Sequence, residues 1–72
     1  MTLRDMRLRR MWTQKELAAR VGVSYQTIQA WESGQSRPRP SAMRQLTEAL
    51  GVEPDDLYMA IEAGLSEGKI AA

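Results

Sequence analysis

Two glutamines three residues apart, Gln26 and Gln29, carry side chains suited to directional hydrogen bonding. A terminal amide donates and accepts at once, so it can match the N6 and N7 edge of adenine. Beside them, the Tyr25 ring could pack on a methyl group or reach a phosphate through its hydroxyl, whereas Ala30 can only touch an apolar group. The sequence has no Cys and no His, which excludes Ser-His-Asp and Cys-His catalytic sets and the usual zinc or haem ligands. These residue types favour recognition over catalysis.

The segment 14–31, QKELAARVGVSYQTIQAW, must position these side chains, and it has the pattern of two short helices joined by a tight turn. Apolar residues recur at helical spacing on both sides of Gly22, which can take the positive φ that the turn needs. Thr13 and Glu16 form a capping-box pattern before the first helix, and Ser24 is a good N-cap for the second. This pattern predicts a helix-turn-helix.

The second helix of this motif, predicted over residues 25–33, turns Ile28 and Trp31 inward. The spacing of Trp31 relative to Ile28 predicts a core position for the indole and argues against a stacking role. The opposite side of the helix must then face out, and it carries Tyr25, Gln26, Gln29 and Ala30.

The chain resembles the Cro/repressor (XRE-like) type of bacterial and phage helix-turn-helix regulators, the group that includes the lambda repressor DNA-binding domain. The resemblance covers roughly residues 3–58 and joins the motifs QKELA, WESG and ALGV. It implies an all-α fold, a compact five-helix bundle. The matching residues are Gln14, Leu17, Ala18, Gly22, Val23, Ile28, Trp31, Glu32, Gly34, Leu46, Ala49, Leu50, Gly51 and Val52.

The chain is expected to form one domain over residues 1–63, followed by a flexible tail over 64–72 that contains two glycines. Ser41 is the expected N-cap of the fourth helix. Met11 stands where the family often has Gly or Asn, so no left-handed cap is expected at the end of the first helix. The predicted helices cover residues 3–10, 14–21, 25–33, 42–50 and a segment from 54 onward.

Charge is divided unevenly along the chain, although the formal net charge is only +1. Residues 1–44 carry nine basic and three acidic side chains, a net charge of +6. Residues 45–72 carry one basic and six acidic side chains, a net charge of −5. A basic half that contains the helix-turn-helix is the footprint expected for phosphate contact. The alternative is a chance division across solvated helix faces.

Each candidate site residue has an expected role. The resemblance implies it for Arg7, Gln14 and the loop of Arg37 and Arg39, and residue type and helix position indicate it for the others. Arg7 would form a structural ion pair with Glu32. The base readers would be Tyr25, Gln26, Gln29 and Ala30, and the phosphate contacts would be Gln14, Ser24, Thr27, Arg37 and Arg39. Guanidinium groups suit phosphate geometry. The alternatives are an ordinary exposed side chain for Gln14, surface packing for Tyr25, helix capping alone for Ser24, and incidental loop charges for the two arginines.

The sequence therefore predicts a DNA-binding transcriptional regulator, a repressor that reads the major groove of a palindromic operator in double-stranded DNA as a homodimer. The resemblance implies a dimer contact through the fifth helix, with Tyr58, Met59 and Ile61. No cofactor, metal or membrane partner is expected. The start MTLRDMRLRR lacks the apolar core of a signal peptide and no run approaches the roughly 18 apolar residues of a membrane span, so a cytoplasmic location is expected.

One alternative keeps the fold and changes the function, because a fold alone does not fix what a protein binds. The chain would then be a protein-interaction module, such as the antitoxin of a toxin–antitoxin pair or a coactivator-like bridging factor. The acidic half and the fifth helix would form the surface for a protein partner. An enzyme is not expected, since no glycine-rich phosphate loop or catalytic set is present.

Overall fold

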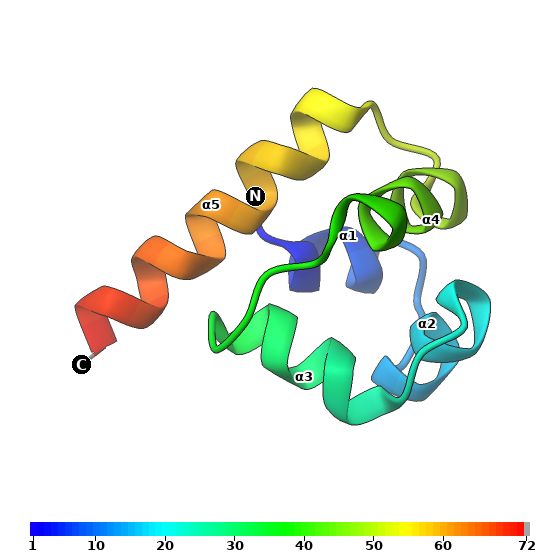
Figure 1. Cartoon of the computed structure of the whole chain (residues 1–72), viewed down its shortest axis with the longest axis horizontal. Helices are drawn as coiled ribbons and strands as arrows, with labels where there is room; N and C mark the ends of the chain where they lie inside the picture. Colours follow the sequence, from blue (N-terminus) through cyan, green and yellow to red (C-terminus); the bar gives the residue numbers. More distant parts are fainter. Residues whose placement is uncertain (72) are drawn as a thin grey trace.

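The computed structural model describes the backbone of residues 1–71 and the side chains of residues 1–64. Helices are the only regular secondary structure of the described residues, which confirms the predicted all-α class. Figure 1 shows α5 along one side of the view and α2 and α4 on the other, with α3 crossing below. The helices are α1 (Leu3–Arg9), α2 (Gln14–Val21), α3 (Tyr25–Ser33), α4 (Pro40–Leu50) and α5 (Pro54–Ala71).

The ends of α2 and α3 have the signals expected from the sequence. Thr13 Oγ1 accepts a hydrogen bond from the Glu16 backbone N–H at 3.1 Å, and Glu16 Oε1 accepts one from the Thr13 N–H at 2.9 Å. The Ser24 side chain accepts from the Thr27 N–H, and Gly22 between the helices has a φ of 81°. These local bonds use N–H groups that a helix start leaves without partners. They fix the angle at which the chain enters each helix.

Helix α1 ends differently from the prediction. The structure places Met11 in the left-handed region, with a φ of 59°, where no left-handed residue was expected. Its side chain is 88% exposed, so it meets no crowding from the core. The Met11 N–H donates to the Leu8 carbonyl and the Trp12 N–H to the Arg7 carbonyl, and these bonds accompany a conformation that is uncommon for a residue with a side chain.

Helix α4 begins earlier than predicted, and Ser41 is not its N-cap. The N-cap is Arg39, which makes no side-chain capping bond, and Pro40 occupies the first helical turn. Proline suits this position because its fixed φ matches the helix and its missing N–H would have had no helical partner.

Helix α5 continues through the segment predicted as a tail, and its backbone is helical to Ala71. The division into a domain over 1–63 and a flexible tail over 64–72 stays a prediction. Side chains beyond residue 64 and the whole of residue 72 lie outside the described part of the chain.

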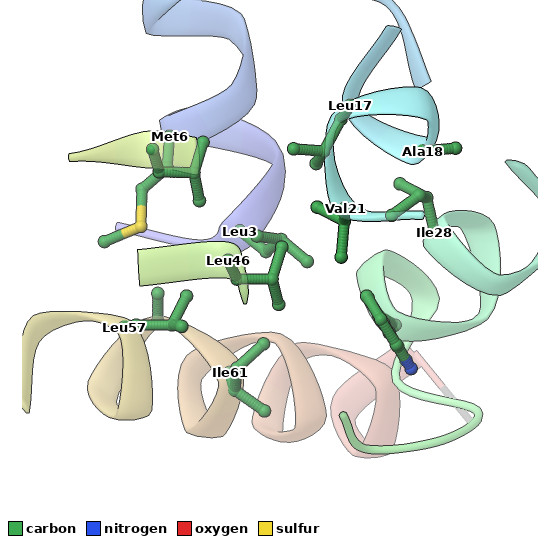
Figure 2. Packing of buried hydrophobic residues seen from close by; sticks show 12 residues of the cluster. Leu3, Met6, Leu17, Ala18, Val21, Ile28, Leu46, Leu57 and Ile61 are labelled. Carbon is green, nitrogen blue, oxygen red and sulfur yellow. The ribbon is translucent and has the colours of Figure 1, made fainter. Parts of the chain in front are cut away.

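The core forms where the apolar faces of all five helices meet, as the labelled side chains in Figure 2 show. Leu17, Ile28, Leu46 and Leu57 have no measurable exposure. The small side chain of Ala18, 3% exposed, lies where α2 packs on α3. Trp31 is buried, which confirms its predicted core position. Among the described residues, no helix combines the length and the apolar character that crossing a membrane requires.

Candidate nucleic-acid interface

The outward face of α3 is open to solvent. Tyr25, Gln26 and Gln29 are exposed and Ala30 is partly buried. The Lys15 ammonium lies 5.3 Å from the centre of the Tyr25 ring, a distance at which a cation and an aromatic face attract each other. The two glutamine amides are therefore free to meet a ligand, while Tyr25 already has a neighbour on the protein surface.

A polar hollow of about 590 Å³ lies along this face between α1, α2 and α3. It brings three predicted base readers together with Gln14, a predicted phosphate contact. It also includes Arg4 and Gln35, which the sequence analysis did not single out. The lining residues are Arg4, Arg7, Gln14, Gln26, Gln29, Ala30, Glu32, Ser33 and Gln35.

The predicted ion pair between Arg7 and Glu32 is formed in this hollow. Arg7 Nε donates to Glu32 Oε2 at 2.6 Å and Arg7 Nη2 donates to Glu32 Oε1 at 3.0 Å. A third guanidinium N–H, from Nη1, donates to the Trp12 carbonyl at 2.9 Å. Both side chains are less than 10% exposed. The pair ties α1 to the last turn of α3 and so fixes α3 on the core.

Gln14, the first residue of α2, joins the same network, because its Nε2 donates to Glu32 Oε1 at 3.3 Å. An amide nitrogen carries two hydrogens, so one N–H is left for another acceptor. The side chain sits at the start of a helix, where the dipole favours an anion. Its phosphate role stays a prediction, with the side chain held in a fixed position.

Ser24 and Thr27 lie at the start of α3, and their hydroxyl oxygens are 3.0 Å apart. The Ser24 oxygen also accepts the Thr27 N–H as a cap. Each hydroxyl therefore has a local partner, as the capping alternative for Ser24 requires.

The structure does not bring Arg37 into the hollow. Its guanidinium pairs with Glu62 of α5 and lies 5.9 Å from the centre of the Tyr58 ring. There it lines a separate, mostly apolar depression of about 390 Å³ between the α3–α4 loop, α4 and α5. Arg39 is exposed at the start of α4. A phosphate contact by Arg37 would require its guanidinium to leave Glu62.

Arg4 could have been found from the sequence by its spacing. It precedes Arg7 by three residues, so both side chains lie on the same side of α1. The resemblance directed attention to Arg7 because of its pairing with Glu32. Gln35 lies beyond the end of α3, where helical spacing gives no guidance.

Fold and site together define a helix-turn-helix protein. A family model described as Helix-turn-helix matches residues 3–57, more than half of the chain, so the chain belongs to this family. The resemblance to Cro/repressor-type proteins is thereby confirmed.

One similar relative is described as an uncharacterized transcriptional regulator in the ATPase CF(0) region of Rhodospirillum rubrum. It is 36% identical over 62 residues, which make up 86% of this chain and 57% of the relative. The chain thus spans little more than half the length of that protein. No solved structure matches the chain.

Proposed function

We propose that this protein is a sequence-specific transcriptional regulator that binds double-stranded DNA and acts as a repressor on a palindromic operator. The observation that carries the proposal is the polar face of α3, on which Gln26 and Gln29 are exposed to solvent. The opposite face of the same helix packs on the core through Ile28 and Trp31. Family membership and the description of the relative as a transcriptional regulator support it.

Helix α3 would lie in the major groove with its N-terminal residues toward the base edges. Gln26 and Gln29 would each form paired hydrogen bonds with adenine, a contact that gives about 1–3 kcal/mol of discrimination. The Tyr25 ring and the Ala30 side chain would contact thymine methyl groups. Alternatively, the Tyr25 hydroxyl would reach a phosphate. The sequence preference would therefore depend mainly on two amides.

Phosphate contacts would set the orientation of this helix on the duplex. The remaining Gln14 N–H and the guanidinium of Arg39 are available for this purpose, and the hydroxyls of Ser24 and Thr27 would contribute only by leaving their mutual hydrogen bond. Basic residues concentrate in the half of the chain that holds α1 to α3, and this distribution favours such an orientation.

A homodimer would form through α5, on which Tyr58 is 54% and Met59 is 68% exposed. Ile61, expected on this surface, is only 4% exposed and belongs to the core. Its predicted place on the dimer surface is therefore wrong, and the proposed contact rests on Tyr58 and Met59. A two-fold axis would place two recognition helices in successive major grooves about 34 Å apart.

The test is a selection of bound sequences from random DNA, followed by Gln29→Ala on the selected duplex and on random duplex. We expect the substitution to weaken the selected site by about 1–3 kcal/mol and to leave random DNA almost unchanged. Gln45→Ala, at an exposed glutamine of α4, is the matched control and should change neither. Equal loss on both DNAs would remove Gln29 from the base readers.

The exposed Tyr58 and Met59 also favour the alternative function, a protein-interaction module such as an antitoxin or a bridging factor. That function needs a protein partner and no duplex DNA. Absence of DNA binding at low salt, together with copurification of a second protein, would support it against the regulator. Neither function requires a catalytic group, and we infer a cytoplasmic location for the regulator.

A further inference from the structure

We propose that Arg4 of α1 contacts a DNA phosphate and so extends the nucleic-acid interface beyond the helix-turn-helix. This inference rests on the proposed function, because it assigns an additional residue to the same DNA-binding face. It is carried by the position of Arg4 in the polar hollow and by the charges of its neighbours.

The position of Arg4 follows from the helical repeat of α1. Arg4 and Arg7 are three residues apart and share one side of the helix. Arg7 reaches across to Glu32 of α3, so this side faces the recognition helix. One turn earlier, Arg4 lines the same hollow as Gln26 and Gln29, and it is exposed.

The other charges in the hollow cancel one another. Both carboxylate oxygens of Glu32 accept hydrogen bonds from Arg7, and Oε1 accepts one from Gln14 as well. Arg4 forms no ion pair with an acidic side chain of residues 1–64. The formal charge of the hollow's lining is therefore +1, and Arg4 supplies it.

Hydrogen bonds from Thr2 lower the pKa of the adjacent Asp5 carboxylate, and its interaction with the Arg4 charge helps to lower it, but the Arg4 and Asp5 side chains form no ion pair. Asp5 Oδ2 accepts the Thr2 backbone N–H at 2.9 Å as part of the capping box of α1. Its oxygen is thus directed to the start of the helix, and the Arg4 guanidinium keeps its five N–H donors for a ligand.

A phosphodiester fits this arrangement better than a base. Arg4 shares the hollow with Ser33, the last residue of α3, and with Gln35, just beyond it, whereas base edges meet the N-terminal residues of a recognition helix. A guanidinium forms paired, charge-assisted hydrogen bonds with phosphate oxygens. Such a contact positions the protein without carrying sequence information.

Arg9 provides a matched control on the same helix. It is exposed like Arg4, and its removal changes the net charge equally. However, it lines a different depression, with Asp56 and Met59 of α5. Because Met59 also belongs to the proposed dimer contact, the variants are compared at a protein concentration at which both are dimeric. A difference between them must then come from position and not from total charge.

The experiment measures the affinity of wild type, Arg4→Ala, Arg9→Ala and Arg4→Lys for the selected duplex and a random duplex over a series of salt concentrations. We expect Arg4→Ala to weaken both duplexes alike, by roughly three- to tenfold. The slope of log affinity against log salt should fall by about 0.9 for each bound protomer. Arg4→Lys should keep most of the slope, and Arg9→Ala should retain all of it.

Equal slopes for Arg4→Ala and Arg9→Ala would overturn the inference, as would a loss confined to the selected duplex. Thermal unfolding by circular dichroism confirms that each variant is folded, and Arg4→Gln provides a second neutral substitution at this exposed position. Wild type that binds no duplex at low salt would overturn the proposed function as well, so the two failures are distinguishable.

Discussion

Two arginine–glutamate pairs connect distant parts of this chain, and their surroundings differ. Arg7 and Glu32 join α1 to the end of α3, with side chains 9% and 7% exposed. Arg37 and Glu62 join the α3–α4 loop to α5, with side chains 50% and 42% exposed. The same two residue types thus form one pair away from water and another at the surface.

The difference lies in how completely each charge is satisfied without water. The inner guanidinium donates to two carboxylate oxygens and to the Trp12 carbonyl. Removing one member of a buried pair leaves the other charge without a partner, whereas a surface pair contributes about 0–1 kcal/mol. The inner pair therefore holds α3 on the core, and the outer pair is expected to exchange its partner for another anion more readily.

The largest expected effect is that of Arg7→Ala. We expect the free energy of unfolding to fall by about 3–5 kcal/mol, because the variant leaves the Glu32 carboxylate buried and unpaired. Urea denaturation followed by circular dichroism measures the change. For a domain of this size, such a loss could abolish folding at physiological temperature.

Arg37→Ala is the control for that comparison, since it breaks the pair at the surface. It should lower the free energy of unfolding by no more than about 1 kcal/mol. If Arg7→Ala and Arg37→Ala lower the free energy of unfolding by similar amounts, burial does not determine how much each pair stabilises the fold.

A smaller effect is expected when the outer pair is broken from the acidic side. Glu62→Gln releases Arg37, and we expect affinity for random duplex to rise by roughly two- to fivefold, with a steeper salt dependence. Fluorescence anisotropy over a salt series measures both.

Two further variants separate release of Arg37 from a general change in charge. Arg37→Ala combined with Glu62→Gln should cancel the rise in affinity for random duplex. Glu48→Gln, at an exposed acid of α4, should give little of that rise. Should the double variant retain the gain, Arg37 would have no part in it.

The smallest effect concerns the exposed local contacts at helix starts. Hydrogen bonds from the Thr13 backbone and side chain lower the pKa of Glu16 from its ordinary value of 4.5. A carboxylate with a lowered pKa in the folded state stabilises the fold above pH 4.5, and this contribution disappears as pH falls through the folded pKa. The melting temperature of Glu16→Ala should therefore lie slightly below that of wild type at neutral pH.

That difference should shrink as the pH falls from 4.5 through the lowered pKa of Glu16 in the folded protein, because the wild-type side chain then loses its charge. Melting temperatures across a pH series measure it. A difference that stays constant into strong acid would mean that the Glu16 charge is not its source.

The helix boundaries that could be predicted depend on residues close together in the sequence. Thr13 and Glu16 satisfy each other across three residues, and Gly22 takes positive φ where the turn requires it. The Arg7–Glu32 pair was expected because a known family has it, even though 25 residues separate its members. Local chemistry and resemblance together gave the correct fold class.

Of the features that were missed, one depends on tertiary placement and two are local. Nothing in the sequence indicated that Arg37 would meet Glu62, since that contact depends on the angle between the α3–α4 loop and α5. Met11 takes positive φ in the turn between α1 and α2, where no glycine stands. In α4, the helix begins at Pro40, one residue before the serine that was predicted to cap it.

The central claim is that the outward face of α3 meets the bases, and an NMR titration of isotopically labelled protein with the selected duplex tests it most directly. The account predicts that DNA strongly shifts the side-chain amide signals of Gln26 and Gln29. The signals of Tyr58 and Met59 should keep the positions that they have in the free dimer. Large shifts confined to α5, with the two glutamine amides unchanged at saturation, would contradict it.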